Sequence, residues 1–194
     1  MKKTIIITAL AALFAAAPCV YAQNADTVVL ASQGDVISES LPTATNFFEK
    51  KIPISEQNRA EIQAQGNFSP TMSELKFFYG EDSTGSLVGT VLFLKMDTQY
   101  GPMKVGVVFA PAGAISNVLV TEATTETESW VQAAEDADVA KAMIGMTSAS
   151  ATDPLKNISE SAIGSKAYFV AQVMATAALR GVIYYNKLFL PLLQ

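Results

Sequence analysis

Residues 87–120 read LVGTVLFLKMDTQYGPMKVGVVFAPAGAISNVLV. The apolar runs at 87–96, 105–110 and 115–120 have the length of strands and are rich in β-branched residues, which indicates three β-strands. The first run is apolar on both faces and is expected to lie centrally in a sheet. Residues 97–102 read as a loop, and Pro111-Ala112-Gly113 reads as a compact hairpin connection.

A fourth strand precedes these three at residues 75–79, and a turn cluster, GEDSTG, separates it from the run that begins at residue 87. An extended entry segment around residues 28–30 has the composition to pair as a strand as well. Helices are expected at 35–41, 56–65, 130–132, 139–144 and 162–185, and the last of these carries a buried stripe at helical spacing. For the helix at 56–65, Ser55 reads as the N-cap and Gly66 as the C-terminal cap. The sequence therefore predicts an α+β fold, in which a four-stranded antiparallel meander packs against helices and one helix is long and C-terminal.

The N-terminus has the three parts of a secretory signal. Lys2 and Lys3 precede the apolar run 5–17, and Val20-Tyr21-Ala22 fits a cleavage site. We expect residues 1–22 to be removed and residues 23–194 to form a single periplasmic or secreted domain without a transmembrane span. The apolar run is shorter than the roughly 20 residues that a membrane span needs, although an uncleaved anchor is the alternative interpretation.

Composition excludes several classes of chemistry. The chain has no histidine, and its one cysteine, Cys19, lies within the signal segment, so catalytic triads and zinc sites of histidine and cysteine have no ligands. Removal of Lys2 and Lys3 from the 13 basic residues leaves 11 against 18 acidic ones, a net charge of −7. An acidic domain repels nucleic acid, so we expect no nucleic-acid partner. No acid–base pair identifies an enzymatic reaction, and catalytic activity is left open.

Two polar segments are candidates for binding. Residues 121–129, TEATTETES, follow the last strand, where loops on a rigid sheet often bind ligands. Residues 157–166, NISESAIGSK, lead into the long helix, whose N-terminus offers free N–H groups to a phosphate. The alternative for both segments is a solvated linker whose hydroxyl groups cap the following helix.

The order and spacing of these segments resemble the FMN-binding domain family, which includes the covalent-flavin subunits of Rnf-type complexes and of sodium-translocating NADH:quinone reductase. The resemblance covers roughly residues 35–187. Its motifs are SLP at 40–42, LVGTVLF at 87–93, VGVVFAPAGAI at 105–115, which is similar to the family's strand–D-x-x-G-x-I–strand hairpin, and the pair Glu126-Thr127. This resemblance implies that Glu126 and Thr127 border the flavin ring, with Trp130 or Tyr100 stacking on it. It also implies that the phosphate is held by five residues: Ser159, Ser161, Gly164, Ser165 and Lys166.

The attachment motif departs from the family's (S/T)-G-A-(S/T)-x-(S/T), in which the second Ser or Thr carries FMN through a phosphoester. Ser159 matches the first position, but Glu160 stands at the glycine and Ala162, without a hydroxyl group, stands at the attachment position. The resemblance therefore implies noncovalent FMN and electron transfer to a redox partner protein. The alternative is a noncatalytic periplasmic binding or assembly module that has lost the flavin.

Overall fold

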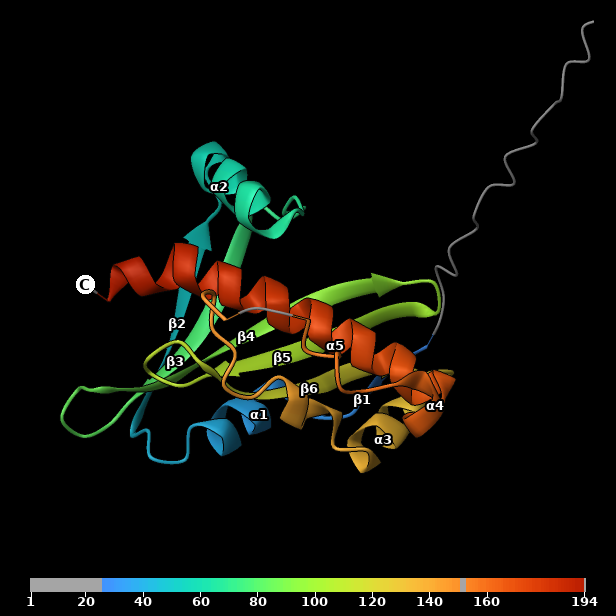
Figure 1. The fold of residues 1–194 in the computed structure, drawn as a ribbon. Helices are drawn as coiled ribbons and strands as arrows, with labels where there is room; N and C mark the ends of the chain where they lie inside the picture. The colour runs from blue at the N-terminus through green and yellow to red at the C-terminus, as the bar shows by residue number, and fades with distance from the viewer. Residues whose placement is uncertain (1–25, 151–152, 194) are drawn as a thin grey trace, which may run out of the picture.

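The computed structural model describes residues 26–150 and 153–193, so the predicted signal segment lies outside the described residues. The chain forms one antiparallel sheet of six strands in the order β1-β6-β5-β4-β3-β2 (Figure 1). The four expected strands are present and each is longer than predicted, although β5 ends one residue before the expected Ala110: β3 (Glu74–Glu81), β4 (Leu87–Thr98), β5 (Gly101–Phe109) and β6 (Ile115–Thr124). The expected loop at 97–102 is a tight hairpin in which Thr98 pairs with Gly101.

The prediction of a four-stranded meander is wrong, because strands β1 (Thr27–Val29) and β2 (Asn46–Pro53) add one strand at each edge of the sheet. Strand β2 reads NFFEKKIP and pairs with β3 along its whole length. Only Ile52 on it is buried, so the strand has no clean alternation of apolar and polar residues. Charged side chains are typical of an edge strand, and they mask its strand character in the sequence.

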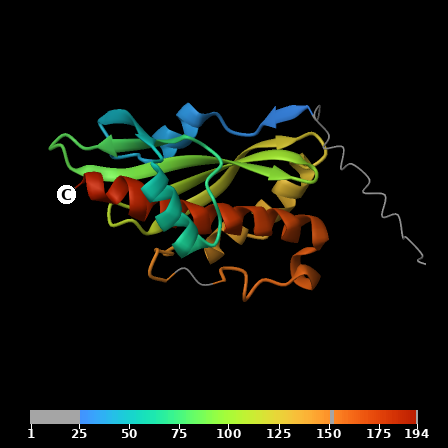
Figure 2. The ribbon, with the colours of Figure 1, turned by 90° about the horizontal axis from the view of Figure 1, so that it is seen from above.

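Within residues 26–150 and 153–193, five α-helices lie on the two faces and at one end of this sheet. Helix α1 (Gln33–Ser40) covers one face, and α2 (Glu56–Gly66) and α5 (Ser165–Tyr184) lie on the other (Figures 1 and 2). Helices α3 (Glu128–Asp136) and α4 (Glu160–Ile163) lie near the N-terminal end of α5. The Ser55 hydroxyl caps α2 by accepting a bond from Asn58 N–H at 3.1 Å, but the helix ends at Asn67 in the left-handed conformation, one residue beyond the predicted Gly66 cap.

The expected helix at 162–185 is two helices. Gly164, at φ 82°, separates the short α4 from α5, because a residue at this angle cannot continue a helix. The expected helix at 139–144 is a single 3₁₀ turn, η1 (Val139–Ala142). After α5 the chain continues through η2 (Tyr185–Phe189) and η3 (Leu190–Leu192), and Phe189 is buried while Leu192 and Leu193 are exposed.

The stretch Ser165–Leu192 is long and apolar enough to cross a membrane, and 67% of its most apolar window is buried within the fold. Val170, Met174, Ala177 and Ala178 face the apolar side of the sheet. Burial against the sheet thus accounts for the apolar composition of this segment. A smaller cluster on the opposite face joins Val36 and Leu41 to Val91 and Val108.

Gly89 in β4 lies where the backbone of β5 and a side chain of the opposite layer leave no room for a Cβ atom. A Cβ atom at this position would lie 2.8 Å from the carbonyl oxygen of Phe109 and 2.8 Å from Leu41 Cδ2. We expect Gly89→Ala to lower the free energy of unfolding by about 1–3 kcal/mol, because the neighbouring backbone must shift. Urea denaturation measures this change. Gly34→Ala in α1 is the matched control, since its Cβ would meet only Ser32 Oγ at 3.9 Å, and an equal loss in both variants would contradict the packing argument.

Candidate functional site

One face of α5 carries two basic residues with an open hollow between them. Five residues of α5 follow one another at intervals of three and four positions, which places them on the same side of the helix: Lys166, Phe169, Val173, Thr176 and Arg180. The hollow has a volume of about 480 Å³ and lies between this side of α5 and the β4–β5 turn, where Asp97, Thr98 and Gln99 form its opposite wall. Its volume falls within the range of small-molecule sites, roughly 300–1,000 Å³.

An aromatic cluster stands at the Lys166 end of this hollow. Tyr100 and Trp130 meet edge to face with ring centres 4.7 Å apart, and Tyr100 meets Phe169 in the same way at 5.0 Å. The ammonium group of Lys166 lies 5.4 Å from the centre of the Trp130 ring. The first turns of α3 and α5 are therefore in contact, so the two polar segments predicted from the sequence lead into neighbouring helices.

Arg180 stands at the other end, partly buried. Its guanidinium lies 5.1 Å from the centre of the Phe68 ring, and it borders a second hollow of about 300 Å³ beside Phe68 and Ser148. Within residues 26–150 and 153–193, neither Arg180 nor Lys166 has a carboxylate within 4.0 Å. Burial raises the pKa of the neighbouring Tyr184 hydroxyl, and the positive charge of Arg180 partly opposes that rise. Each cation is thus placed over an aromatic ring, and no described carboxylate neutralises it.

The five residues predicted to hold a phosphate come together at the junction of α4 and α5. Ser159, Ser161, Gly164, Ser165 and Lys166 are all exposed. The hydroxyl groups of Ser159 and Ser161 lie 3.1 Å apart, and neither caps α4 or α5. Glu160 and Ala162, which depart from the family motif at its glycine and at its attachment position, are exposed in the same short helix.

Glu126 and Thr127 occupy the turn between β6 and α3 and differ in exposure. Glu126 is exposed, whereas Thr127 is buried. The Thr127 hydroxyl lies 2.9 Å from that of Thr124 and accepts the Thr124 N–H at 3.1 Å. Thr127 therefore closes its own turn, and its hydroxyl is already engaged. The contact of Thr127 with a flavin ring stays a prediction. In the structure the Thr127 hydroxyl group is occupied by hydrogen bonds within its own turn.

Phe169 and Arg180 were not among the residues predicted for the site. The sequence does contain a signal for them, because both lie at helical spacing from Lys166 and a cation at such a position is unusual in an otherwise apolar helix. Among the described residues, no group of three acidic, histidine or cysteine side chains is placed to hold a metal ion.

Comparison with known proteins gives no assignment: no family, curated protein or solved structure matches the chain.

Proposed function

We propose that this chain is an exported domain that binds FMN noncovalently along the exposed side of α5. The phosphate lies at the N-terminus of α5 beside Lys166, and the isoalloxazine ring lies against Phe169 in the hollow toward Arg180. One observation carries the proposal: a hollow of about 480 Å³ is lined by Phe169 and Arg180 and has Lys166 one turn of helix beyond its Phe169 end, and neither cation has a carboxylate partner among the described residues.

The residues fit a noncovalent flavin better than a covalent one. Ala162 has no hydroxyl group for a phosphoester, whereas Ser165, Lys166 and the first N–H groups of α5 can donate hydrogen bonds to a phosphate. When bound, FMN supplies the electron-transfer chemistry, and the protein supplies position and electrostatics. In this arrangement Arg180 places a positive charge at the end of the hollow opposite the phosphate.

The test is a spectroscopic titration of the protein isolated from a periplasmic fraction. We expect FMN to bind with a dissociation constant on the order of micromolar and its fluorescence to change on binding. Riboflavin, which has the ring but no phosphate, is expected to bind at least about tenfold more weakly, because it loses the contacts at the α5 N-terminus. No spectral change with FMN up to on the order of 100 µM would contradict the proposal.

A second candidate is a binding module that has lost the flavin. The engaged hydroxyl of Thr127 favours this alternative, because one of the polar groups expected to border the ring is tied up within its turn. Protein that is colourless as isolated and that fails to bind either flavin would support it. Protein that binds FMN but not riboflavin would exclude it.

A further inference from the structure

The outer edge of strand β6 is open between two points where other segments pair with it. At one end, Thr121 accepts hydrogen bonds from the N–H groups of Leu30 and Ala31 at 2.9 and 3.2 Å. At the other end, Ile115 exchanges hydrogen bonds with Gly145 and Met146 at 2.8 and 2.9 Å. Strand β1 pairs only with Glu122–Thr124, so within the described part of the chain no strand lies beside residues 116–120 on this edge.

One backbone group in this gap is paired with a side chain and not with a neighbouring strand. Val118 donates its N–H to the side-chain oxygen of its own neighbour Asn117 at 2.9 Å. Backbone groups alternate between the two edges of a strand, so Val120 presents its N–H and C=O on the same side as Val118. From Ile115 to Thr121 the gap is about 20 Å long, which is enough for about five extended residues.

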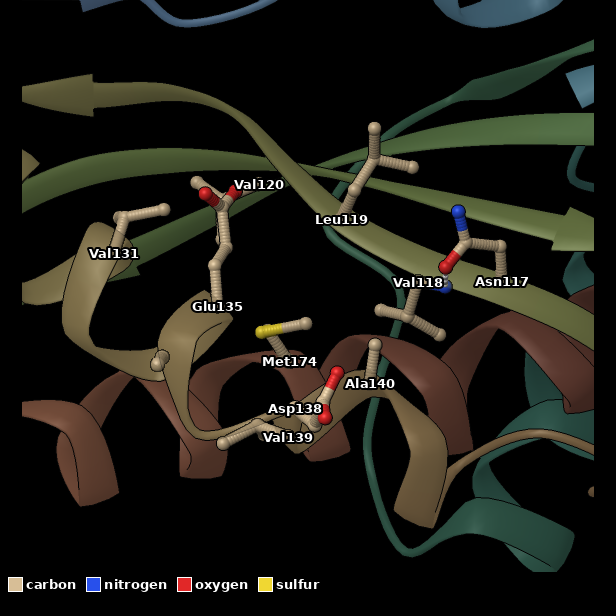
Figure 3. A pocket seen from close by; sticks show the side chains of 11 residues that line it. Asn117, Val118, Leu119, Val120, Val131, Glu135, Asp138, Val139, Ala140 and Met174 are labelled. Atoms are coloured by element: carbon tan, nitrogen blue, oxygen red, sulfur yellow. Dashed lines mark hydrogen bonds between the residues drawn. The ribbon is translucent and has the colours of Figure 1, made fainter. Parts of the chain in front are cut away.

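A hollow of about 180 Å³ lies directly beside this edge, between β6 and the segment formed by α3 and η1 (Figure 3). Its apolar lining comes from Val118, Val120, Val131, Val139 and Met174. A cavity of this size accommodates one apolar side chain. The hollow thus offers a side-chain pocket next to a stretch of β6 that has no strand partner among the described residues, which is the combination that strand-addition sites use.

The rim of the hollow is acidic. Glu135 and Asp138 line it, and Figure 3 shows both carboxylates at its margin. Asp138 pairs with Lys141 at 2.6 Å, whereas Glu135 has no ion pair with any described residue. Glu135 also borders a second hollow of about 500 Å³, which continues along α3 to Glu128. A ligand that follows the groove therefore meets negative charge, in a chain whose net charge is −5.

We propose that this groove docks an extended, basic segment of a partner protein as an additional strand beside β6. Main-chain hydrogen bonds to the Val118 carbonyl and to Val120 hold the segment in register, an apolar side chain fills the hollow, and a lysine or arginine meets Glu135. The groove lies beside α3 and the edge of β6, away from the β4–β5 turn and the side of α5 assigned to the flavin. This partner site therefore goes beyond the proposed flavin binding and is testable without flavin.

The test uses a fluorescently labelled peptide, Lys-Val-Thr-Val-Thr-Val-Lys, and fluorescence anisotropy. We expect binding with a dissociation constant on the order of 100 µM and at least about tenfold weaker binding to Glu135→Lys. Glu74→Lys is the matched control, since it makes the same charge change at an exposed position on β3, three strands away from β6. Equal losses in the two variants would show nonspecific charge attraction and would overturn the proposal, as would the absence of binding at millimolar peptide.

A second measurement separates strand pairing from simple side-chain contact. The same peptide with N-methyl groups on alternate residues keeps its charge and side chains but loses backbone donors. We expect the peptide methylated on the edge that faces β6 to bind at least about tenfold more weakly than the peptide methylated on the other edge. Equal binding of the two methylated peptides would rule out an added strand.

Discussion

Replacing Phe109 by alanine will lower the free energy of unfolding by about 3–5 kcal/mol, as expected for removal of a fully buried aromatic ring. Phe109 ends strand β5 and has no exposed surface. Its ring stacks on Tyr185 with centres 4.6 Å apart, and a Cβ atom built on Gly181 would lie 3.3 Å from its Cζ atom. The ring thus joins the centre of the sheet to the C-terminal half of α5, where the surrounding backbone leaves little freedom for a cavity to collapse.

Urea denaturation of residues 23–194 measures this loss, and the corresponding fall in melting temperature is on the order of 10 °C for a domain of this size. Phe47→Ala is the matched control, because the same ring is removed from an edge strand where 48% of the residue is exposed. We expect the control to lose less than about 1 kcal/mol. A loss below about 1 kcal/mol in Phe109→Ala would mean that α5 does not pack on β5 as described.

The central strands of the sheet were predictable because their residues are too apolar for any position other than a buried one. Strands β4, β5 and β6 contain long apolar runs separated by proline and glycine, and such runs are explained only by burial. The edges were harder to predict for the opposite reason. In β2, Glu49, Lys50 and Lys51 interrupt the apolar residues, and β1 has only three residues, so pairing partners rather than local composition define these strands. The number of strands, six instead of four, depends on these contacts between distant segments.

The predicted phosphate residues were found together because they are close in the sequence and precede one helix. The sequence could not show the helix break at Gly164, because the break depends on the φ angle of this glycine. It also could not show the hollow along α5, because the hollow depends on the position of the β4–β5 turn beside the helix. Phe169 and Arg180 belong to the site only through that packing. For Thr127 the sequence predicted a ligand contact, which stays a prediction, and the structure adds hydrogen bonds of its hydroxyl group that close the turn before α3.

Reversing the charge of Lys166 is expected to weaken FMN binding at least about 30-fold, or roughly 2 kcal/mol, since the variant Lys166→Glu loses an ammonium group and adds repulsion at the helix N-terminus. Fluorescence titration measures the affinity, and circular dichroism checks that α5 is intact. Lys50→Glu is the control, because Lys50 is an exposed lysine on strand β2, at the far edge of the sheet from β6. The same loss in both variants would indicate a general effect of net charge.

Arg180→Ala distinguishes which end of the hollow holds the phosphate. Fourteen residues of helix separate Lys166 from Arg180, a distance of about 21 Å along the axis, so one phosphate cannot contact both side chains. If the phosphate lies at the N-terminus of α5, Arg180→Ala will weaken FMN by only about threefold, and riboflavin by a similar factor, because Arg180 then faces the ring that both molecules share. If Arg180→Ala instead weakens FMN more than Lys166→Glu does and leaves riboflavin unchanged, the phosphate lies at the Arg180 end. The orientation proposed here would then be wrong, although the hollow itself would remain the binding site.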